Sequence, residues 1–394
     1  MTGRSTGPYP EMRIGLVWHT VNSGNLGVGA LTAGHIGIVT KAALDANVSP
    51  RFVIFEGKQA GERYIWEADE VVGLTNLELL LPHRYFRRIR SVDCLLDIGE
   101  GDGFSDIYGL KRYLRQIATK VIAKIAGTPY LVAPQTVGPF KSHVTRLLAR
   151  LALSGVHAVS VRDDESAKLI VRISSGIRPL TTTDVAFAMD ADPVALPGSD
   201  RVRIGLNISG LLYNQRSREY GIQTGYDYHK LVHEIAAYLE SSDRFEVHLF
   251  GHVFSSDPID NDGDVLHAFA ARYPSFIVAP KFSTPWEAKS YIGAMDAVIA
   301  SRMHACIASL SAGVPVIPVS YSPKFENLFL ALGYPWTIPY RGVSDEEALR
   351  ILAVALSDLP AMKRDVQIAR SEASRRLAAY QQMLTFFLSD VRRA

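Results

Sequence analysis

Two basic residues stand at the start of a predicted helix in the second half of the chain, where they could bind an anion. Residues 296–320 read as a buried strand, a sharp turn, a buried helix and a second buried strand. Ser301 is expected to cap this helix and Gly313 to end it, which places Arg302 and His304 in its first turn. The amino end of a helix already carries a positive partial charge of roughly half a unit, so two cations there are mildly destabilising unless an anion binds. The arrangement predicts a site for a small, highly charged anion such as a phosphate compound.

Each of these two residues also has a purely structural interpretation. Arg302 could pair with a carboxylate of the protein such as Asp296 or Glu326, and His304 could be a satisfied core histidine. Their joint position favours function, because open α/β sheets bind ligands at the carboxyl ends of their strands. Lys324 adds another cation at the start of the next predicted helix.

Two glycine-rich loops follow predicted strands in the first half of the chain. The loop 19–30 contains Asn25, and its glycines allow a close backbone approach to a ligand. Its glycine spacing misses the dinucleotide fingerprint, and a plain Gly/Asn turn explains it equally well. The loop 99–109 alternates glycines with acids, and Asp102 could act as a base towards a sugar hydroxyl. The acids could equally form a solvated turn or cap a helix, Asp106 especially.

Three more polar groups follow strands. Gln135 and Thr136 are neutral hydrogen-bonding residues suited to substrate hydroxyls, although a Gly-Pro turn is the simpler interpretation. His252 could bind phosphate or donate a proton, or it could be an ordinary turn histidine. Arg162 ends a strand and could supply a further cation to the same cleft.

Two other segments have modest interpretations. Residues 257–264 look like a calcium loop but lack its glycine and glutamate at the required positions, so we expect an acidic turn that caps a helix. The basic and aromatic segment His83–Arg90 reads as a solvated helix face, with weak contact to anionic lipid headgroups as the alternative.

The composition is that of a soluble globular protein with two domains. The chain has 394 residues, a hydrophobic content of 47% and a formal net charge of +2, which gives no general reason to expect nucleic acid. Its two cysteines, Cys94 and Cys306, have no metal-type spacing, so we expect no metal site and no disulfide. The amino-terminal segment lacks the pattern of a signal peptide, and we expect a cytoplasmic protein.

Short apolar runs alternate with helical periodicity along the chain, which predicts an α/β fold. Two prolines and a glycine mark residues 190–200 as a linker. We therefore predict a Rossmann-like domain over residues 1–195, a second over 196–375, and a carboxyl-terminal helix over 376–394 that packs back on the first. Two such doubly wound domains facing each other would form a central cleft, where small ligands are expected. The predicted strands are 13–18, 52–55, 94–98, 130–133, 158–161, 202–208, 246–250, 276–278, 297–300 and 314–319.

At these loops the chain resembles the polysaccharide pyruvyl transferase family. The resemblance rests on six stretches in the family's order: the loop 19–30, then 97–106, 133–140, 161–166, 183–187, and 300–305 through 313–317. The arginine-x-histidine helix start is the most specific of them. Two positions depart from the family: Asn25-Leu26-Gly27 stands where a glycine-aspartate pair is common, and Glu100 replaces a usual glycine.

The resemblance implies a GT-B-like fold and a reaction in which pyruvate from phosphoenolpyruvate is transferred onto two hydroxyls of a sugar, forming a cyclic ketal. It places donor contacts on Arg302 and His304, with Ser301 and Met303 beside them at the helix start. His304 or His252 is then the candidate acid and Asp102 the candidate base. No metal or cofactor is implied, with phosphoenolpyruvate as co-substrate.

Two alternatives remain open from the sequence. A nucleotide-sugar-dependent GT-B glycosyltransferase would use the same helix start for a diphosphate. A catalytically silent member could act as an assembly factor for glycan machinery. The acceptor would be a glycan or a lipid-linked saccharide, with at most peripheral membrane contact at the inner face of the membrane.

Overall fold

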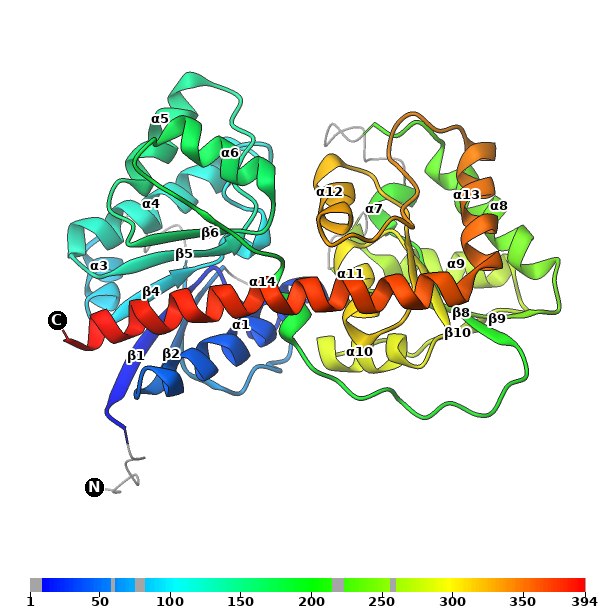
Figure 1. Ribbon diagram of the computed structural model, residues 1–394, viewed down its shortest axis with the longest axis horizontal. Coiled ribbons are helices and arrows are strands. Elements are labelled where there is room, and N and C mark those ends of the chain that lie inside the picture. The colour runs from blue at the N-terminus through cyan, green and yellow to red at the C-terminus, as the bar shows by residue number, and fades with distance from the viewer. Residues whose placement is uncertain (1–8, 58–60, 75–81, 215–222, 256–259, 394) are drawn as a thin grey trace. The chain divides into compact units, whose positions relative to one another are not determined.

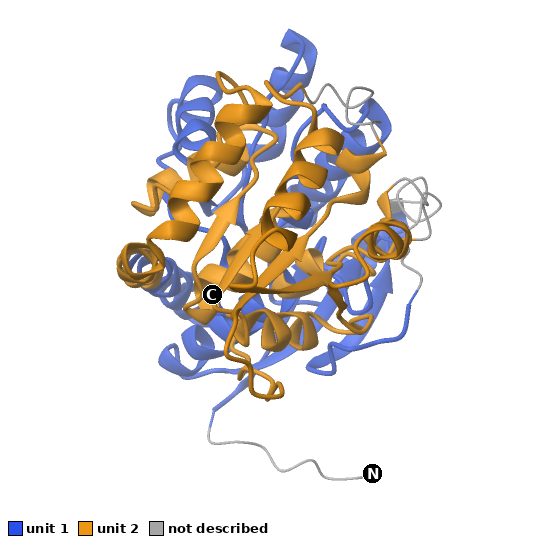
Figure 2. Cartoon of the chain, turned by 90° about the vertical axis from the view of Figure 1, so that its right-hand side faces the viewer, with its two compact units in different colours: residues 1–23, 31–188, 375–394 blue, residues 24–30, 189–374 orange. Residues whose placement is uncertain are grey.

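The computed structural model describes residues 9–57, 61–74, 82–214, 223–255 and 260–393, which form two compact units (Figures 1 and 2). Unit 1 comprises residues 9–23, 31–188 and the carboxyl-terminal residues from 375 onwards. Unit 2 comprises residues 24–30 and 189–374. The short segment 24–30 therefore lies with unit 2, whereas the sequence analysis had placed it in the first domain.

Unit 1 is built on a parallel sheet whose described strands run in the order β3-β2-β1-β4-β5-β6-β7. The order reverses between β1 and β4, which is the topological switch point where such sheets bind ligands. The inner strands are almost wholly buried, as parallel strands covered on both faces should be. The strands are β1 (Glu11–Val17), β2 (Ser49–Glu56), β3 (Ala68–Gly73), β4 (Cys94–Asp97), β5 (Tyr130–Gln135), β6 (Ala158–Val161) and β7 (Leu180–Thr181).

Helices cover both faces of this sheet. On one face lie α3 (Pro82–Ile89), α4 (Leu110–Ala126), α5 (His143–Leu153) and α6 (Asp164–Ile173), and on the other lies α1 (Leu26–Asp45) (Figure 1). Short turns of 3-10 helix follow at η1 (Gly99–Gly101) and η2 (Val185–Ala188). By length and composition α1 would suit a membrane span, but 72% of its most apolar window is buried within the protein, as in a core helix.

Unit 2 contains a smaller parallel sheet with the described order β10-β9-β8-β11-β12 and a switch point between β8 and β11. Its strands are β8 (Val202–Asn207), β9 (Phe245–Phe250), β10 (Ile277–Val278), β11 (Ala297–Ala300) and β12 (Val316–Pro318). Strand β12 is a three-residue edge strand that ends at Pro318. Proline cannot donate to a ladder, which accounts for the short pairing of this strand.

The helices of unit 2 also lie on both sides of their sheet. Apolar side chains of α8, α9 and α13 form the core with strands β8, β9 and β11. The helices are α7 (Gly210–Tyr213), α8 (Tyr228–Glu240), α9 (Asp262–Arg272), α10 (Pro285–Gly293), α11 (Met303–Ala312), α12 (Pro323–Ala331), α13 (Asp345–Ser357) and α14 (Leu359–Arg393). The last residues of α14, from Arg375 onwards, belong to unit 1.

A buried chain of hydrogen bonds fixes this end of α14 in unit 1. His19 Nδ1 lies 3.2 Å from the carbonyl oxygen of Val17, His19 Nε2 lies 2.8 Å from His35 Nδ1, and His35 Nε2 lies 2.8 Å from the Tyr380 hydroxyl. A carbonyl only accepts, so Nδ1 of His19 carries the proton and its Nε2 accepts from His35. Nε2 of His35 must then accept from Tyr380. The His19–His35–Tyr380 chain thus has one direction, with both imidazoles neutral.

Candidate functional site

The carboxyl end of β8, at the switch point of unit 2, is organised by Asn207. Its amide nitrogen donates to the carbonyl of Phe250 at the end of β9 over 3.1 Å, and its amide oxygen accepts from the backbone N–H of Arg302 over 3.1 Å. One buried side chain therefore holds two strand ends and the entry to α11 in fixed positions. The sequence analysis did not single out Asn207, although a polar residue ending an apolar strand is a usable signal.

Helix α11 begins one residue later than expected. Arg302 itself is the extended N-cap residue, and Met303 and His304 are the first two helical residues, both half-buried. Ser301 is buried and accepts a hydrogen bond of 2.6 Å from the Tyr228 hydroxyl. The prediction that Ser301 caps the helix is therefore wrong, because its side chain is committed to packing against α8. Gly313 ends the helix with a left-handed φ of +86°, as predicted.

Arg302 is held by two carboxylates of its own unit. Its Nη2 lies 2.6 Å from Asp262 and 2.5 Å from Asp260, and its Nε lies 3.1 Å from Asp262. The side chain is about one-tenth exposed, and Nη1 makes no hydrogen bond to any residue in the described part of the chain. Burial opposes the charged form, but Asp262 and Asp260 outweigh it and raise the pKa of Arg302 above its ordinary value.

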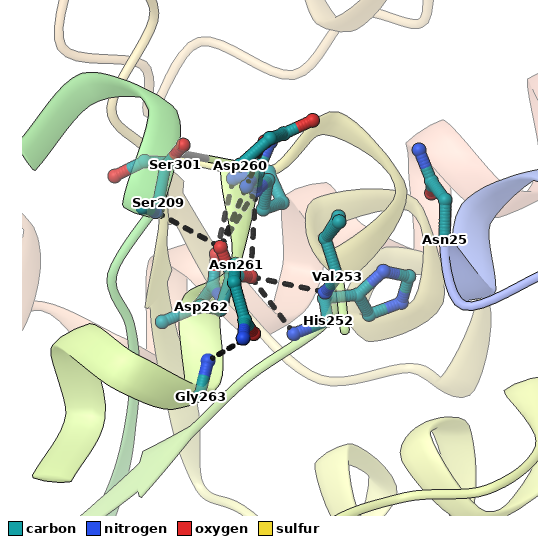
Figure 3. A network of polar contacts seen from close by, with 12 residues as sticks. Asn25, Ser209, His252, Val253, Asp260, Asn261, Asp262, Gly263 and Ser301 are labelled. Carbon is teal, nitrogen blue, oxygen red and sulfur yellow. Dashed lines mark hydrogen bonds and ion pairs between the residues drawn. The ribbon is translucent and has the colours of Figure 1, made fainter. Parts of the chain in front are cut away.

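Asp262 is the centre of this arrangement. It is fully buried and accepts hydrogen bonds from the backbone N–H groups of Gly210 over 2.9 Å, His252 over 2.9 Å and Val253 over 3.1 Å, besides those from Arg302. Figure 3 shows Asp260, Asn261 and Asp262 gathered beside His252 and Val253. One carboxylate thus joins α7, the loop after β9 and the start of α11.

The acidic turn at residues 260–264 both caps α9 and binds Arg302, whereas the sequence predicted only the cap. Asn261 caps α9 by accepting from the N–H of Gly263 over 3.0 Å, which agrees with a capping turn. The flanking acids Asp260 and Asp262 balance the charge of Arg302, which was not foreseen. Residues 257–259 of this turn lie outside the described residues. Arg302 thus pairs with carboxylates of the protein, but these are Asp260 and Asp262 and not the Asp296 or Glu326 that the sequence suggested.

The amino end of α1 packs against the same place. Asn25 forms an antiparallel bridge with Val253, and the N–H of Leu26 donates to the carbonyl of His252 over 3.2 Å. A Cβ atom on Gly27 would lie 2.4 Å from Nδ1 of His304, so no larger residue fits there without displacing that imidazole. The loop 19–30 thus brings a second helix start to His304, and this contact is why residues 24–30 group with unit 2.

The two histidines of unit 2 differ in their surroundings. His252 is buried, and burial, with a smaller contribution from nearby His304, lowers its pKa to about 3. It is therefore a neutral imidazole near neutral pH and a poor source of a proton. His304 is only half-buried and lies at the helix start. Lys324, also half-buried, occupies the first turn of α12 after its N-cap Ser322.

In unit 1, the loop after β4 carries the candidate base. Asp102 is half-buried, accepts a hydrogen bond from the hydroxyl of Tyr108, and is one of the charges that raise the pKa of Arg112 and Arg162. The guanidinium groups of Arg112 and Arg162 thus lie within electrostatic reach of the Asp102 carboxylate. Asp102, Arg112 and the half-exposed Tyr108 form a polar and aromatic group at the switch point of this sheet.

Glu100 in the same loop is one of the two positions that depart from the family the chain resembles. It has a left-handed backbone, with φ of +54° and ψ of +25°, between two glycines that also have positive φ. A side chain in this conformation costs on the order of 1–2 kcal/mol, so the loop retains a shape suited to glycine. The Glu100 carboxylate is paired with Arg112 over 2.6 Å.

Three further predicted contact residues have internal partners in unit 1. Arg162 is buried, paired with Asp184 over 2.7 Å, and donates to the Thr136 hydroxyl over 2.8 Å. Gln135 is fully buried, and its amide donates to the carbonyl of Asp97 over 2.7 Å. Gln135 and Thr136 thus form hydrogen bonds with the backbone of the loop 97–103. Arg162, which the sequence suggested as a further cation for the cleft, has its charge balanced by Asp184.

Comparison with known families gives the decisive observation. The model of the family described as polysaccharide pyruvyl transferase matches residues 39–323, well over half of the chain. The chain belongs to the polysaccharide pyruvyl transferase family. The matched region contains the loop after β4 and the start of α11. A comparison with curated protein sequences gave no match.

Solved structures establish the fold class of this pyruvyl transferase family member. The S. aureus MnaA–UDP co-structure is 11% identical with a TM-score of 0.55 and covers 91% of each chain. A UDP-N-acetylglucosamine 2-epimerase is 10% identical with a TM-score of 0.58, covering 94% of this chain and 95% of its own. The Neisseria meningitidis UDP-GlcNAc 2-epimerase bound to UDP-GlcNAc is 11% identical with a TM-score of 0.53, covering 95% and 99%. The protein has the GT-B fold, with two parallel α/β sheets.

Proposed function

We propose that the protein transfers pyruvate from phosphoenolpyruvate onto two hydroxyls of a sugar in a polysaccharide or its precursor, forming a cyclic ketal and releasing phosphate. Family membership supports a transferase. The observation that carries the donor assignment is the convergence of two helix starts, those of α1 and α11, on the half-buried imidazole of His304. Backbone N–H groups at helix starts bind phosphate and carboxylate groups.

Unit 2 is the proposed donor side. The donor's phosphate would accept from the N–H groups at the start of α11 and from His304, with Ser301, Met303 and Lys324 around it. Arg302 offers Nη1 to the donor while Asp262 holds its Nε and Nη2. Asp260, which is about one-third exposed, is the carboxylate that an incoming anion would replace on Nη2. Asn25 would contact the donor from the amino end of α1.

The chemistry proceeds through positive character at the carbon that bears the phosphate oxygen. An acid protonates the methylene carbon of the donor, which becomes the methyl group. A sugar hydroxyl adds to the adjacent carbon as a base removes its proton. Phosphate then departs, stabilised by Arg302, His304 and the start of α11, and the second hydroxyl closes the ring as it loses its own proton. The ketal carbon thus loses its C–O bond to phosphate and its share of the C=C π bond, and it gains two C–O bonds to the sugar. The neighbouring carbon gains one C–H bond and becomes the methyl group.

We assign the acid to His304 and the base to Asp102. His252 is the weaker candidate for the acid, because its pKa of about 3 leaves it unprotonated near neutral pH. Asp102, beside Tyr108 and Arg112, is the proposed base on the acceptor side, with Gln135, Thr136 and Arg162 supporting its loop. No metal or cofactor enters this proposal.

The test combines one variant with two classes of ligand. His304→Asn should keep the folding transition of the wild type, since the side chain is half-buried, and should lose phosphate release from phosphoenolpyruvate in the presence of acceptor. Arg302→Ala is a poorer test, because it would leave Asp262 buried without its cation.

Ligand binding separates the donor classes. Phosphoenolpyruvate should raise the melting temperature, by the amount that its affinity and concentration dictate, while UDP- and GDP-sugars should not. A shift with a nucleotide sugar alone would favour the glycosyltransferase alternative, for which the UDP-bound fold neighbours are the supporting observation. Wild-type phosphate release from the His304→Asn variant would contradict its role as acid.

The proposed cellular setting is the cytoplasm, at the inner face of the membrane where a lipid-linked acceptor would be reached. Fractionation of cells that produce the protein tests this directly. A protein that binds phosphoenolpyruvate but never transfers label from it to any saccharide would instead fit the assembly-factor alternative.

A further inference from the structure

Helices α4 and α5 of unit 1 run side by side in parallel. The Tyr113 hydroxyl of α4 donates to the carbonyl of Thr145 at the start of α5. Near their other ends, Lys124 donates to the Ser154 hydroxyl over 2.7 Å. The two helices are therefore in contact at both ends, and their outward faces form one continuous surface of unit 1.

This surface carries large apolar side chains where a surface helix is normally polar. Each helix contributes three of them, all between 44% and 70% exposed: Leu110, Leu114 and Ile125 from α4, and Val144, Leu147 and Leu151 from α5. On α5 their spacing of three and four residues places them in one row along the helix. We name these six residues the apolar stripe.

Cations border the apolar stripe, and the helices α4 and α5 that carry it contain no Asp or Glu. With about 100° per residue, Arg146 and Arg150 lie together on the half of the exposed face of α5 that the apolar row leaves free. Lys111 is exposed beside Leu110 and Leu114 on α4. The helices α3, α4 and α5 together carry seven exposed Lys and Arg residues and no Asp or Glu, although the whole chain has a net charge of only +2. Arg88 is one of the seven and is paired with Glu70, whereas Lys120 of α4 is buried against Asp97 and does not contribute to this surface.

An apolar row beside a basic row, lying flat on a folded domain, is the pattern of a helix that rests in the interface of an anionic bilayer. The apolar side chains enter the boundary between headgroups and acyl chains, and the arginines contact the lipid phosphates. A second copy of the chain fits less well, because pairing two such faces would bring like charges together with no acid between them.

We infer that the outer face of α4 and α5 docks the protein on a membrane surface that contains anionic phospholipid. This inference does not depend on the proposed reaction, because none of the residues that carry it belongs to the candidate site. It assigns the membrane contact to α4 and α5, whereas the sequence offered such contact only as an alternative for residues 83–90.

The experiment is flotation of the full-length protein with vesicles. Phosphatidylcholine vesicles containing phosphatidylglycerol should carry the protein upwards, and vesicles of phosphatidylcholine alone should carry much less. Binding should weaken as salt is raised, because exposed charges are screened. The double variant Arg146→Glu/Arg150→Glu should reduce partitioning at least about thirtyfold, and Val144→Ser/Leu147→Ser/Leu151→Ser should also release the protein.

Matched controls lie in unit 2. Lys363→Glu/Arg364→Glu makes the same change of charge on exposed residues of α14, and Leu330→Ser/Val354→Ser/Ile368→Ser removes three exposed apolar side chains. Both should bind vesicles as the wild type does, and all variants should keep the wild-type circular dichroism spectrum.

Three results would overturn the inference. One is equal flotation of the wild type and the α5 variants. Another is equal binding to neutral and anionic vesicles. The third is a dimer in sedimentation that the triple serine variant of α5 dissolves, since the apolar stripe would then be covered by a second copy.

Discussion

Replacement of Asp262 by asparagine tests the centre of the candidate site. The carboxylate is fully buried, and both of its oxygens accept hydrogen bonds, from three backbone N–H groups and from Arg302. Asparagine is nearly the same size but has no charge, and its NH2 group would face an N–H donor. Asp262→Asn therefore removes one member of a buried ion pair and leaves at least one donor unsatisfied.

The expected loss of stability follows from these contacts. Breaking a buried pair by removing one partner costs about 3–5 kcal/mol, because the remaining charge stays buried. For a domain of the size of unit 2, a loss of 1 kcal/mol lowers the melting temperature by roughly 2–4 °C, so the transition of this unit should fall by about 6–20 °C. Asp260 offers a matched comparison on the same guanidinium. It is about one-third exposed, so Asp260→Asn should cost at most about 1 kcal/mol.

Differential scanning calorimetry with and without phosphoenolpyruvate is the appropriate assay. Asp262→Asn should lower the melting transition and abolish the stabilisation by phosphoenolpyruvate, since Arg302 loses its position. Asp260→Asn should melt near the wild type and gain more from phosphoenolpyruvate, because the donor no longer competes with a carboxylate. If both variants melt within about 2 °C of the wild type, the account of Asp262 as the centre of the site is wrong.

Three further outcomes are expected. Gly27→Ala should reduce phosphate release about a hundredfold with an unchanged fold. The new Cβ would lie 2.4 Å from Nδ1 of His304 and would displace the imidazole. Wild-type rates in steady-state assays of this variant would contradict the contact. Tyr380→Phe should cost about 1–3 kcal/mol in urea unfolding, because Nε2 of His35 loses its donor inside the protein; an unchanged midpoint would argue against the directed chain. The free energy of unfolding should fall as the pH drops from about 6.5 towards 3. In this range the unfolded chain protonates His252, whereas in the folded chain the pKa of His252 is lowered to about 3 and the imidazole stays neutral. Urea midpoints that do not change between neutral and mildly acidic pH would refute that linkage.

Much of the fold could be predicted because apolar runs and their boundaries are local signals. The strands β6 and β11 begin and end at the predicted residues. The edge strand β3 was missed, because its charged residues at the sheet edge dilute the apolar pattern. Strand β7 has only two residues, too few to give any pattern.

The candidate site was harder to predict, because its key contacts join residues that are distant in sequence. Arg302 and His304 stood out by type and position, yet nothing local connects Arg302 with Asp260 and Asp262, which are about 40 residues away. The same limit applies to Gly27, whose importance lies in a close approach to α11. Sequence patterns therefore located the start of α11 but did not identify the carboxylates that balance the charge of Arg302.

The His19–His35–Tyr380 chain has a consequence for biosynthesis. His35 and Tyr380 are separated by 345 residues, so the ribosome makes the imidazole pair long before it makes the hydroxyl partner. Domains generally fold in the order in which they leave the ribosome, but here unit 1 lacks the donor to His35 until Tyr380 has emerged. A fragment that stops at residue 188 would leave Nε2 of His35 without its Tyr380 donor. The hydrogen-bond chain of unit 1 is thus complete only after all of unit 2 has been synthesised.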